Sequence, residues 1–257
     1  MLESMQRVTG QPSMVVDSVG FTHKGLRRRH NEDSILFPPA VTSGRTGERY
    51  YLAAVADGVG GNPAGEVASA AAIETAAATF QDADTADTPR VLNSLFRSAN
   101  QAVLEAGSDH RCRGLATTLV VAILSDHELW VGNVGDSRAY LLRGSRASQI
   151  TEDHTWRLSE GRRGRVRGSN VITRALGAGE DVPVDLFGPI ALQCGDSIAL
   201  CSDGFYGAVD ISELASNLDR MEVGTAAGHV FDVAAARSAD DVSLVLCSVT
   251  LPAALLR

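Results

Sequence analysis

The sequence predicts an α+β protein in which antiparallel strands and helices form separate layers. Runs suited to buried strands follow one another at hairpin-length gaps, and the segments of helical character come in pairs instead of alternating with single strands. No internal repeat or linker interrupts the 257 residues, and a chain of this length can bury a core without disulfides or a structural metal. We therefore expect one domain over residues 15–250, with a flexible segment at 1–14 and a tail at 251–257.

The predicted strands are short apolar runs. They are rich in β-branched residues and are bounded by Gly, Asp, Asn or Ser, as strands usually are. In chain order they are YLAAVA (51–56), TTLVVAIL (117–124), ELWVGNV (128–134), RAYLL (138–142), SIALC (197–201) and VSLVLCSV (242–249).

Four helices are predicted between and after these strands. The first is rich in alanine and opens with Pro63, which the first turn of a helix tolerates. The second places Val91, Leu95 and Val103 on one stripe, as a helical period requires. The expected ranges are 63–80, about 90–106, 211–219 and 224–236.

Composition excludes several classes of function. The chain is 44% hydrophobic and 21% charged, with a formal net charge of -8. An acidic protein of this kind is not expected to bind nucleic acid or an anionic membrane through its overall charge. No signal peptide and no apolar run long enough to cross a bilayer are apparent. We expect a cytoplasmic protein without a membrane segment.

The four cysteines form neither a CxxC pair nor a regular framework. This pattern is typical of reduced core residues in a cytosolic protein. The cysteines are Cys112, Cys194, Cys201 and Cys247.

Acidic residues stand at the ends of the predicted strands. Asp57, Asp136 and Asp203 each follow an apolar run, and Asp240 and Asp241 precede the last one. Several carboxylates that converge would repel one another unless cations lay among them. A set of oxygen ligands without His or Cys favours Mg²⁺ or Mn²⁺ over Zn²⁺. Two such ions can share one water and direct it at phosphorus, which would allow hydrolysis without a protein nucleophile.

The glycines that follow Asp57 suit such a site. Gly58 lets the backbone turn so that its own carbonyl can face a metal. A lone DGxGG is equally typical of an ordinary turn after a strand. The other acids at strand ends favour the metal site.

Together these segments resemble the type 2C metal-dependent protein serine/threonine phosphatases in their compact bacterial form. The resemblance runs from about Ser18 to Val249 through motifs in the expected order. They are RRHNED (28–33), VADGVGG (55–61), ATTLV (116–120), VGNVGDSRAYLLR (131–143), TEDHT (151–155), NVITRALG (170–177), CSDGFYG (201–207) and ADDVSLVL (239–246). It implies a four-layer α-β-β-α sandwich, two central antiparallel sheets flanked by antiparallel helix pairs.

The resemblance also implies a binuclear Mn²⁺ or Mg²⁺ centre. Asp57 would bridge both ions, Glu32 and the carbonyl of Gly58 would bind one, and Asp203 and Asp240 would bind the other. Asp136, together with Asp203, matches the pair that holds a third, weaker metal in bacterial members.

Two more residues take roles from the same resemblance. Arg28 matches the arginine that binds the substrate phosphate, a contact that suits a planar guanidinium. Because three arginines run together at 27–29, a solvated basic cluster is the alternative there. Asp33 would orient the metal-bound water from outside the ligand set.

The sequence departs from the family pattern at several places. Val59 stands where some eukaryotic members have a histidine proposed as general acid, and Asp241 stands where most members have Asn. The segment 156–169 is shorter than the usual bacterial flap and is dense in arginine. It could be a solvated loop or an anion-recruiting flap beside the active site. The flap residues that could recruit substrate are Arg162, Arg163, Arg165 and Arg167.

The resemblance implies a monomeric phosphatase that removes phosphate from phospho-Ser or phospho-Thr in proteins and opposes a bacterial Ser/Thr kinase. A pseudophosphatase that binds phosphoproteins with little turnover is the alternative from another class. A third possibility is a phosphatase dedicated to one regulatory partner, although that branch normally carries a fused sensor or membrane segment. Retention of all five expected metal carboxylates, Glu32, Asp57, Asp136, Asp203 and Asp240, favours the active enzyme.

Overall fold

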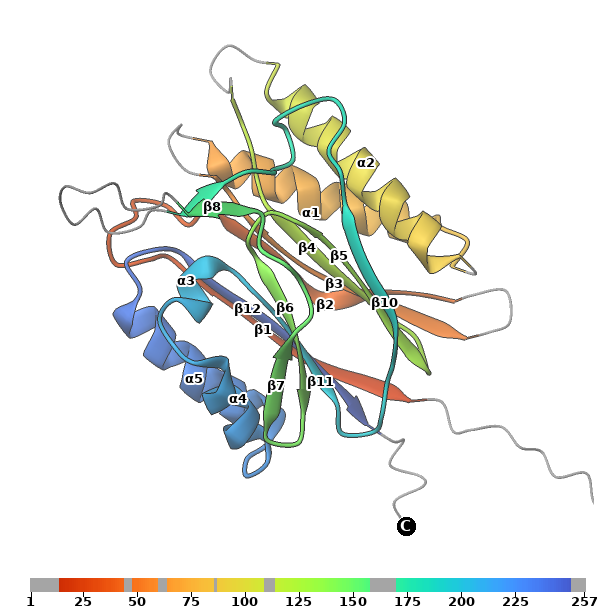
Figure 1. Cartoon of the computed structure of the whole chain (residues 1–257), viewed down its shortest axis with the longest axis vertical. Helices are drawn as coiled ribbons and strands as arrows, with labels where there is room; N and C mark the ends of the chain where they lie inside the picture. The colour runs from red at the N-terminus through yellow and green to blue at the C-terminus, as the bar shows by residue number, and fades with distance from the viewer. Residues whose placement is uncertain are drawn as a thin grey trace, which may run out of the picture.

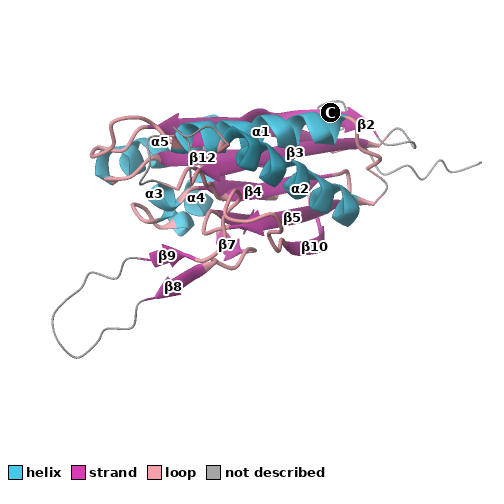
Figure 2. Cartoon of the chain, turned by 90° about the horizontal axis from the view of Figure 1, so that it is seen from above, coloured by secondary structure: helices cyan, strands magenta, loops and turns pink. Residues whose placement is uncertain are grey.

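The computed structural model describes residues 14–43, 48–59, 64–85, 87–108, 114–157 and 170–250. Two five-stranded antiparallel sheets pack face to face, and helices cover the outer face of each sheet (Figures 1 and 2). The layers therefore run α, β, β, α, and the predicted four-layer sandwich is confirmed.

The first sheet joins the two ends of the described chain. Its spatial order is β1 (Val15–His23), β12 (Val242–Thr250), β11 (Ser197–Cys201), β6 (Arg138–Arg143) and β7 (Arg146–Gln149). The second sheet has the order β10 (Asp185–Ala191), β5 (Glu128–Val134), β4 (Leu119–Leu124), β3 (Arg49–Asp57) and β2 (Asp33–Ser43). A separate two-stranded ribbon, β8 (Thr155–Arg157) with β9 (Asn170–Ile172), projects from one end of the sandwich (Figure 2).

Each sheet has its own helices. The second sheet is covered by α1 (Gly65–Gln81) and α2 (Thr88–Ala106), and the first by α3 (Asp203–Tyr206), α4 (Ile211–Leu218) and α5 (Val223–Arg237). The four predicted helices thus exist, with small differences at their ends. The differences reach two residues at the start of α2, which begins at Thr88 instead of about 90. The predicted start of the first helix, Pro63, lies outside the described residues. The short α3 was not predicted.

The interior strands are mostly apolar because both of their faces are buried. In β3, Leu52 and Ala54 pack under α1 and α2, whereas Ala53 and Val55 point between the sheets. Side chains alternate across a strand, so a strand between two cores has no polar face. The six predicted strands are the six interior strands of the two sheets.

The predictions missed all four edge strands, β1, β7, β10 and β2. Edge strands tolerate proline and irregular pairing because one row of backbone groups needs no partner in the sheet. Pro38 and Pro39 lie in β2 where its register shifts, and a similar shift accompanies Pro189 in β10. Cys194 also differs from expectation, since it is exposed after β10 and not in the core. Cys112 lies outside the described residues.

The antiparallel order brings the termini of six strands to one end of the sandwich. Asp33 at the start of β2 is the register partner of Asp57 at the end of β3. The end of β5 pairs with the start of β4, and Cys201 at the end of β11 pairs with Leu244 near the start of β12. The predicted acidic residues therefore share one end of the molecule.

Candidate metal centre

The acidic residues form an electrostatically coupled group at this end. Burial raises the pKa of Asp57 well above its usual value, and the charges of Asp33, Asp203, Asp240 and Asp136 raise it further. Such mutual effects require short distances between the carboxyl groups. The structure thus brings together aspartates that lie up to 207 positions apart in the sequence, from Asp33 to Asp240.

The same causes act on the other members. Burial, followed by the charges of Asp241 and Asp203, raises the pKa of Asp33 to about 7. Burial and Asp203 raise the pKa of Asp136 to about 6, and burial and Asp240 raise that of Asp203 to about 6. Burial and mutual repulsion thus disfavour the ionised carboxylates of this group, and a bound cation would stabilise them.

Asp57 and Gly58 are fixed through their backbones. The Asp57 N–H donates to Thr118 Oγ1 at 3.0 Å, and the Asp57 carbonyl accepts from the Thr118 N–H at 2.8 Å and from Thr117 Oγ1 at 2.9 Å. A Cβ on Gly58 would lie 2.5 Å from the carbonyl oxygen of Gly65 and 2.8 Å from that of Glu32. Position 58 therefore has no room for a side chain, which is why the chain needs a glycine behind Asp57.

Glu32 and Asp33 carry buried oxygens that accept no hydrogen bond from the described residues. Glu32 Oε2 and both carboxylate oxygens of Asp33 have no hydrogen bond within the described part of the chain. Gly65, the first residue of α1, packs so closely that a Cβ there would lie 2.8 Å from Glu32 Oε2. Buried polar atoms without a partner are uncommon, and these oxygens suit a cation or its bound water.

Arg28 lies at the rim of the carboxylate group. Its Nη2 is 2.5 Å from Asp240 Oδ1, and its Nη1 is 3.5 Å from Glu32 Oε2. Burial lowers the pKa of this guanidinium, but the charge and hydrogen bond of Asp240 outweigh burial and raise it. A cation between Glu32 and Asp240 would compete with Arg28 for both carboxylates.

Asp241 has a role that the sequence did not predict. Its buried carboxylate accepts the backbone N–H of Gly25 through Oδ1 and that of Glu32 through Oδ2, both at 2.9 Å. It therefore ties the loop that carries Arg28 and Glu32 to the start of β12. Asp241, which stands where most members of the family that the sequence resembles have Asn, thus positions that loop.

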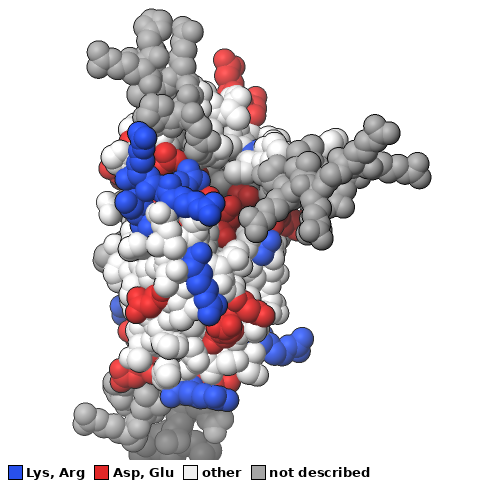
Figure 3. All heavy atoms as spheres, turned by 90° about the vertical axis from the view of Figure 1, so that its left-hand side faces the viewer, with Lys and Arg blue, Asp and Glu red and all other residues white. Residues whose placement is uncertain are grey.

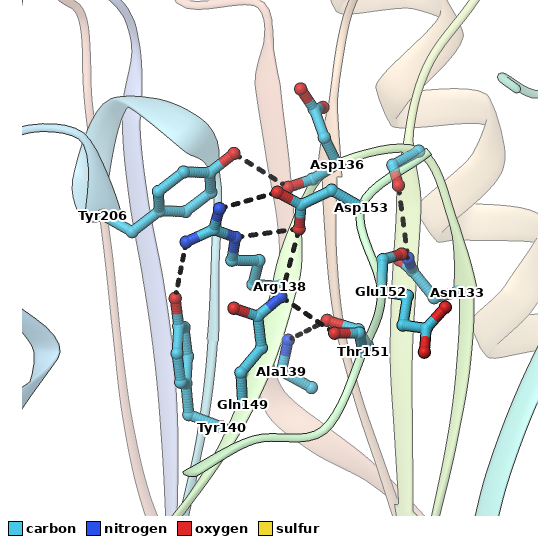
Figure 4. Close-up of polar contacts among 11 residues, drawn as sticks. Asn133, Asp136, Arg138, Ala139, Tyr140, Gln149, Thr151, Glu152, Asp153 and Tyr206 are labelled. Carbon is cyan, nitrogen blue, oxygen red and sulfur yellow. Dashed lines mark hydrogen bonds and ion pairs between the residues drawn. The ribbon is translucent and has the colours of Figure 1, made fainter. Parts of the chain in front are cut away.

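The turn that carries Asp136 is supported from the side by a polar network (Figure 4). Tyr206 Oη donates to the Asp136 carbonyl at 3.1 Å. Arg138 donates from Nε and Nη2 to the Asp153 carboxylate at 2.8 and 2.6 Å, and its Cζ lies 3.6 Å from the centre of the Tyr206 ring. These residues fix the main chain at Asp136 and were not recognised in the sequence.

A second polar group braces the base of the β8–β9 ribbon. His154 Nδ1 accepts the Gly135 N–H at 3.0 Å, so its Nε2 carries the proton that faces Asp185 Oδ2 at 3.0 Å. Arg174 Nη1 donates to Asp185 Oδ1 at 2.7 Å. The hydrogen bonds from His154 and Arg174 lower the pKa of Asp185. His154 thus has a structural role beside Asp136.

The donor chemistry fits hard divalent cations, because the grouped side chains offer only oxygen. In the ranges that the structure describes, no three acidic, histidine or cysteine side chains already form a ligand set around one point. Two of the proposed ligands, Glu32 and Asp240, form ion pairs with Arg28 instead. The flap residues Arg162, Arg163, Arg165 and Arg167 lie outside the described residues.

No helix within the described part of the chain combines the length and apolar character that a bilayer crossing requires.

Comparison with known proteins gives consistent matches. The family model of Protein phosphatase 2C matches residues 17–183. The chain is 33% identical over 206 residues to the serine/threonine phosphatase stp of Listeria welshimeri, and this match covers 75% of this chain and 79% of that protein. It is 31% identical over 255 residues to the serine/threonine protein phosphatase PstP of Mycobacterium tuberculosis, which covers 95% of this chain and 46% of that protein.

A solved structure agrees with these sequence matches. The catalytic domain of the serine threonine protein phosphatase PstP in complex with 2 manganese ions is 28% identical, with a TM-score of 0.73. The match covers 92% of this chain and 99% of that one. Sequence and fold therefore agree over nearly the whole chain.

Proposed function

Because the chain belongs to the protein phosphatase 2C family and is a protein serine/threonine phosphatase, we propose that it hydrolyses phosphoserine and phosphothreonine with two Mn²⁺ or Mg²⁺ ions. The observation that carries the proposal is the group of carboxylates that the two sheets bring together, in which Glu32 Oε2 and both Asp33 oxygens are buried without a hydrogen bond to any described residue. Manganese in the solved PstP domain supports the choice of metal.

We assign the ligands as the sequence suggested. Asp57, Glu32, the Gly58 carbonyl, Asp203 and Asp240 would hold two ions, with Asp57 shared between them. Asp136 and Asp203 would hold a third, weaker ion. The chemistry that such cations supply when bound is activation of water as a nucleophile toward phosphorus and neutralisation of charge on the phosphate oxygens.

The remaining roles belong to the protein's own side chains. Arg28 binds two oxygens of the substrate phosphate, since its guanidinium already lies at the rim of the carboxylate group. Asp33, which is buried next to Glu32, would orient a water bound at the centre. In this proposal the substrates are proteins phosphorylated by a Ser/Thr kinase, and the enzyme acts as a monomer.

Hydrolysis of a phosphothreonine peptide tests the proposal directly. The purified protein is stripped of metal, Mn²⁺ or Mg²⁺ is titrated back, and Asp203→Ala is compared with Asp219→Ala. Asp219 is an exposed acid after α4 and serves as the matched control. We expect activity only with added metal and a loss of at least about 100-fold in Asp203→Ala, as when one electrostatic group leaves an active site.

The test also separates the pseudophosphatase alternative. Tight peptide binding without turnover at saturating Mn²⁺ would contradict an active enzyme and favour a phosphoprotein-binding module. Full metal-dependent activity in Asp203→Ala would show that the catalytic centre lies elsewhere.

A further inference from the structure

Positive charge is concentrated beside the candidate metal centre. Lys24, Arg27 and Arg29 are exposed on the loop between β1 and β2, and Arg237 is exposed at the end of α5. The Arg27 N–H donates to the Ala239 carbonyl at 3.2 Å, which brings the loop next to the segment that follows Arg237. We call Lys24, Arg27, Arg29 and Arg237 the basic rim. Figure 3 shows Lys and Arg gathered on this face next to acidic side chains.

Folding does not explain this concentration of charge. The chain has a net charge of -8, yet none of the four basic-rim side chains forms an ion pair within the described ranges. Neighbouring cations without partners repel one another. An anion that binds from outside the chain would relieve this repulsion.

The backbone beneath the basic rim is held in place. The Gly25 N–H donates to Asp241 Oδ1 at 2.9 Å, and the Leu26 N–H donates to the Ser238 carbonyl at 3.1 Å. A Cβ on Gly25 would overlap the carbonyl group of Asp240, so the loop can lie this close only because position 25 is glycine. A fixed backbone lowers the ordering cost when the exposed side chains bind a ligand.

The position of Arg28 indicates which anion the basic rim would bind. Arg28 stands between Arg27 and Arg29 in the sequence and faces the carboxylate group, whereas its two neighbours are exposed. If Arg28 binds the phosphate, residues on either side of the phosphorylated residue pass over the basic rim, because an extended peptide advances about 3.3 Å per residue. Arginine forks match carboxylates in geometry and charge.

We propose that the basic rim binds acidic side chains flanking the phosphorylated residue, so that the enzyme prefers phosphosites in acidic segments of its substrates. This inference rests on the proposed function and names a substrate class for the same site. The charge of the basic rim also raises the encounter rate with such segments, an effect that salt screens.

Paired phosphothreonine peptides test the inference on the full chain with Mn²⁺. One peptide has Asp and Glu on both sides of the phosphothreonine, and the other has Asn and Gln there. The readout is the ratio of kcat/KM for the two peptides, measured at about 0.01 M and about 1 M salt, where the screening length falls from about 30 Å to about 3 Å. Because the neutral peptide is the internal reference, changes in metal affinity cancel.

The variant for this test is Arg27→Gln with Arg29→Gln, and the control is Arg220→Gln. Arg220 is also exposed, but it lies away from the candidate metal centre. It follows α4, and Leu218 of that helix lines a hollow together with Thr250, at the end of β12 opposite to Asp240. We expect a ratio of about threefold to tenfold at low salt, the size that a few exposed ion pairs produce. The ratio should approach one at high salt and in the double variant, because KM for the acidic peptide rises while kcat stays the same. In Arg220→Gln the ratio should remain as in the wild type.

The outcomes separate this inference from the proposed function. Equal kcat/KM for both peptides at low salt, or an unchanged ratio in the double variant, would mean that the basic rim is only a solvated cluster, although the enzyme is a phosphatase. Failure to hydrolyse either peptide would overturn the proposed function and this inference with it.

Discussion

Replacement of Asp241 should loosen the metal centre without removing any proposed ligand. The Asp241 carboxylate accepts two backbone N–H groups, from Gly25 and Glu32, and is only 3% exposed. A hydrogen bond to a charged group contributes about 1.5–3 kcal/mol. Asp241→Ala removes two and leaves two amides without acceptors, so we expect a loss of about 3–5 kcal/mol in the free energy of unfolding.

Asp241→Asn should cost less. Its single amide oxygen can accept one of the two N–H groups, while its NH₂ group faces the other donor. We expect a loss of about 1.5–3 kcal/mol, together with weaker metal binding, since the Glu32 loop loses one tie and the site loses one negative charge. The order of stability should therefore be wild type, then Asn, then Ala.

Urea denaturation of metal-stripped protein measures these losses, and Mn²⁺ titration measures the effect on the centre. The control is Asp210→Ala, because Asp210 accepts one backbone N–H, from Ser212, at the exposed start of α4. It should cost about 1 kcal/mol and leave Mn²⁺ affinity unchanged. If Asp241→Ala were no less stable than Asp210→Ala and bound Mn²⁺ like wild type, the positioning role of Asp241 would be refuted.

Three further predictions concern the same end of the sandwich. In metal-stripped protein, folding raises the pKa of Asp33 from 3.8 to about 7, so the folded state binds this proton more tightly than the unfolded state. Tm should therefore fall as the pH rises from 5 to about 7. A Tm that rises in this window would contradict the raised pKa of Asp33. Gly58→Ala should destabilise the protein by about 1–3 kcal/mol through overlap with backbone, whereas Gly224→Ala in α5, where the nearest atom to a new Cβ is 3.7 Å away, should not, as denaturation curves of both will show. Tyr206→Phe removes the hydrogen bond to the Asp136 carbonyl and should cost about 1 kcal/mol in the same measurement, with an unchanged stability counting against that bond.

The interior of the fold could be predicted because burial on two faces leaves a strong signal in the sequence. Val120 and Val121 are neighbours in β4 that serve different cores, and such runs have no polar positions. The edge strands lack this signal. In β10, for example, Asp185 pairs with Arg174 and Pro189 lies at a register shift, so the segment does not resemble an apolar strand.

The candidate site could be predicted only where chemistry and strand ends coincide. Asp57 and Asp203 stand out because each follows an apolar run. The hydrogen bonds of Asp241 to Gly25 and Glu32 span 216 and 209 positions, and no local pattern announces contacts of that range. The stacking of Arg138 on Tyr206 was missed for a similar reason, since Tyr206 lies 68 positions further along the chain, in α3.

The division of the acidic residues between the two sheets has a mechanical consequence. Asp33 and Asp57 belong to the sheet under α1 and α2, whereas Asp203 follows β11 and Asp240 precedes β12 of the other sheet. Cations bound by residues of both sets would cross-link the two sheets at this end of the sandwich. Neither sheet, isolated with its own helices, would carry the full set of proposed ligands.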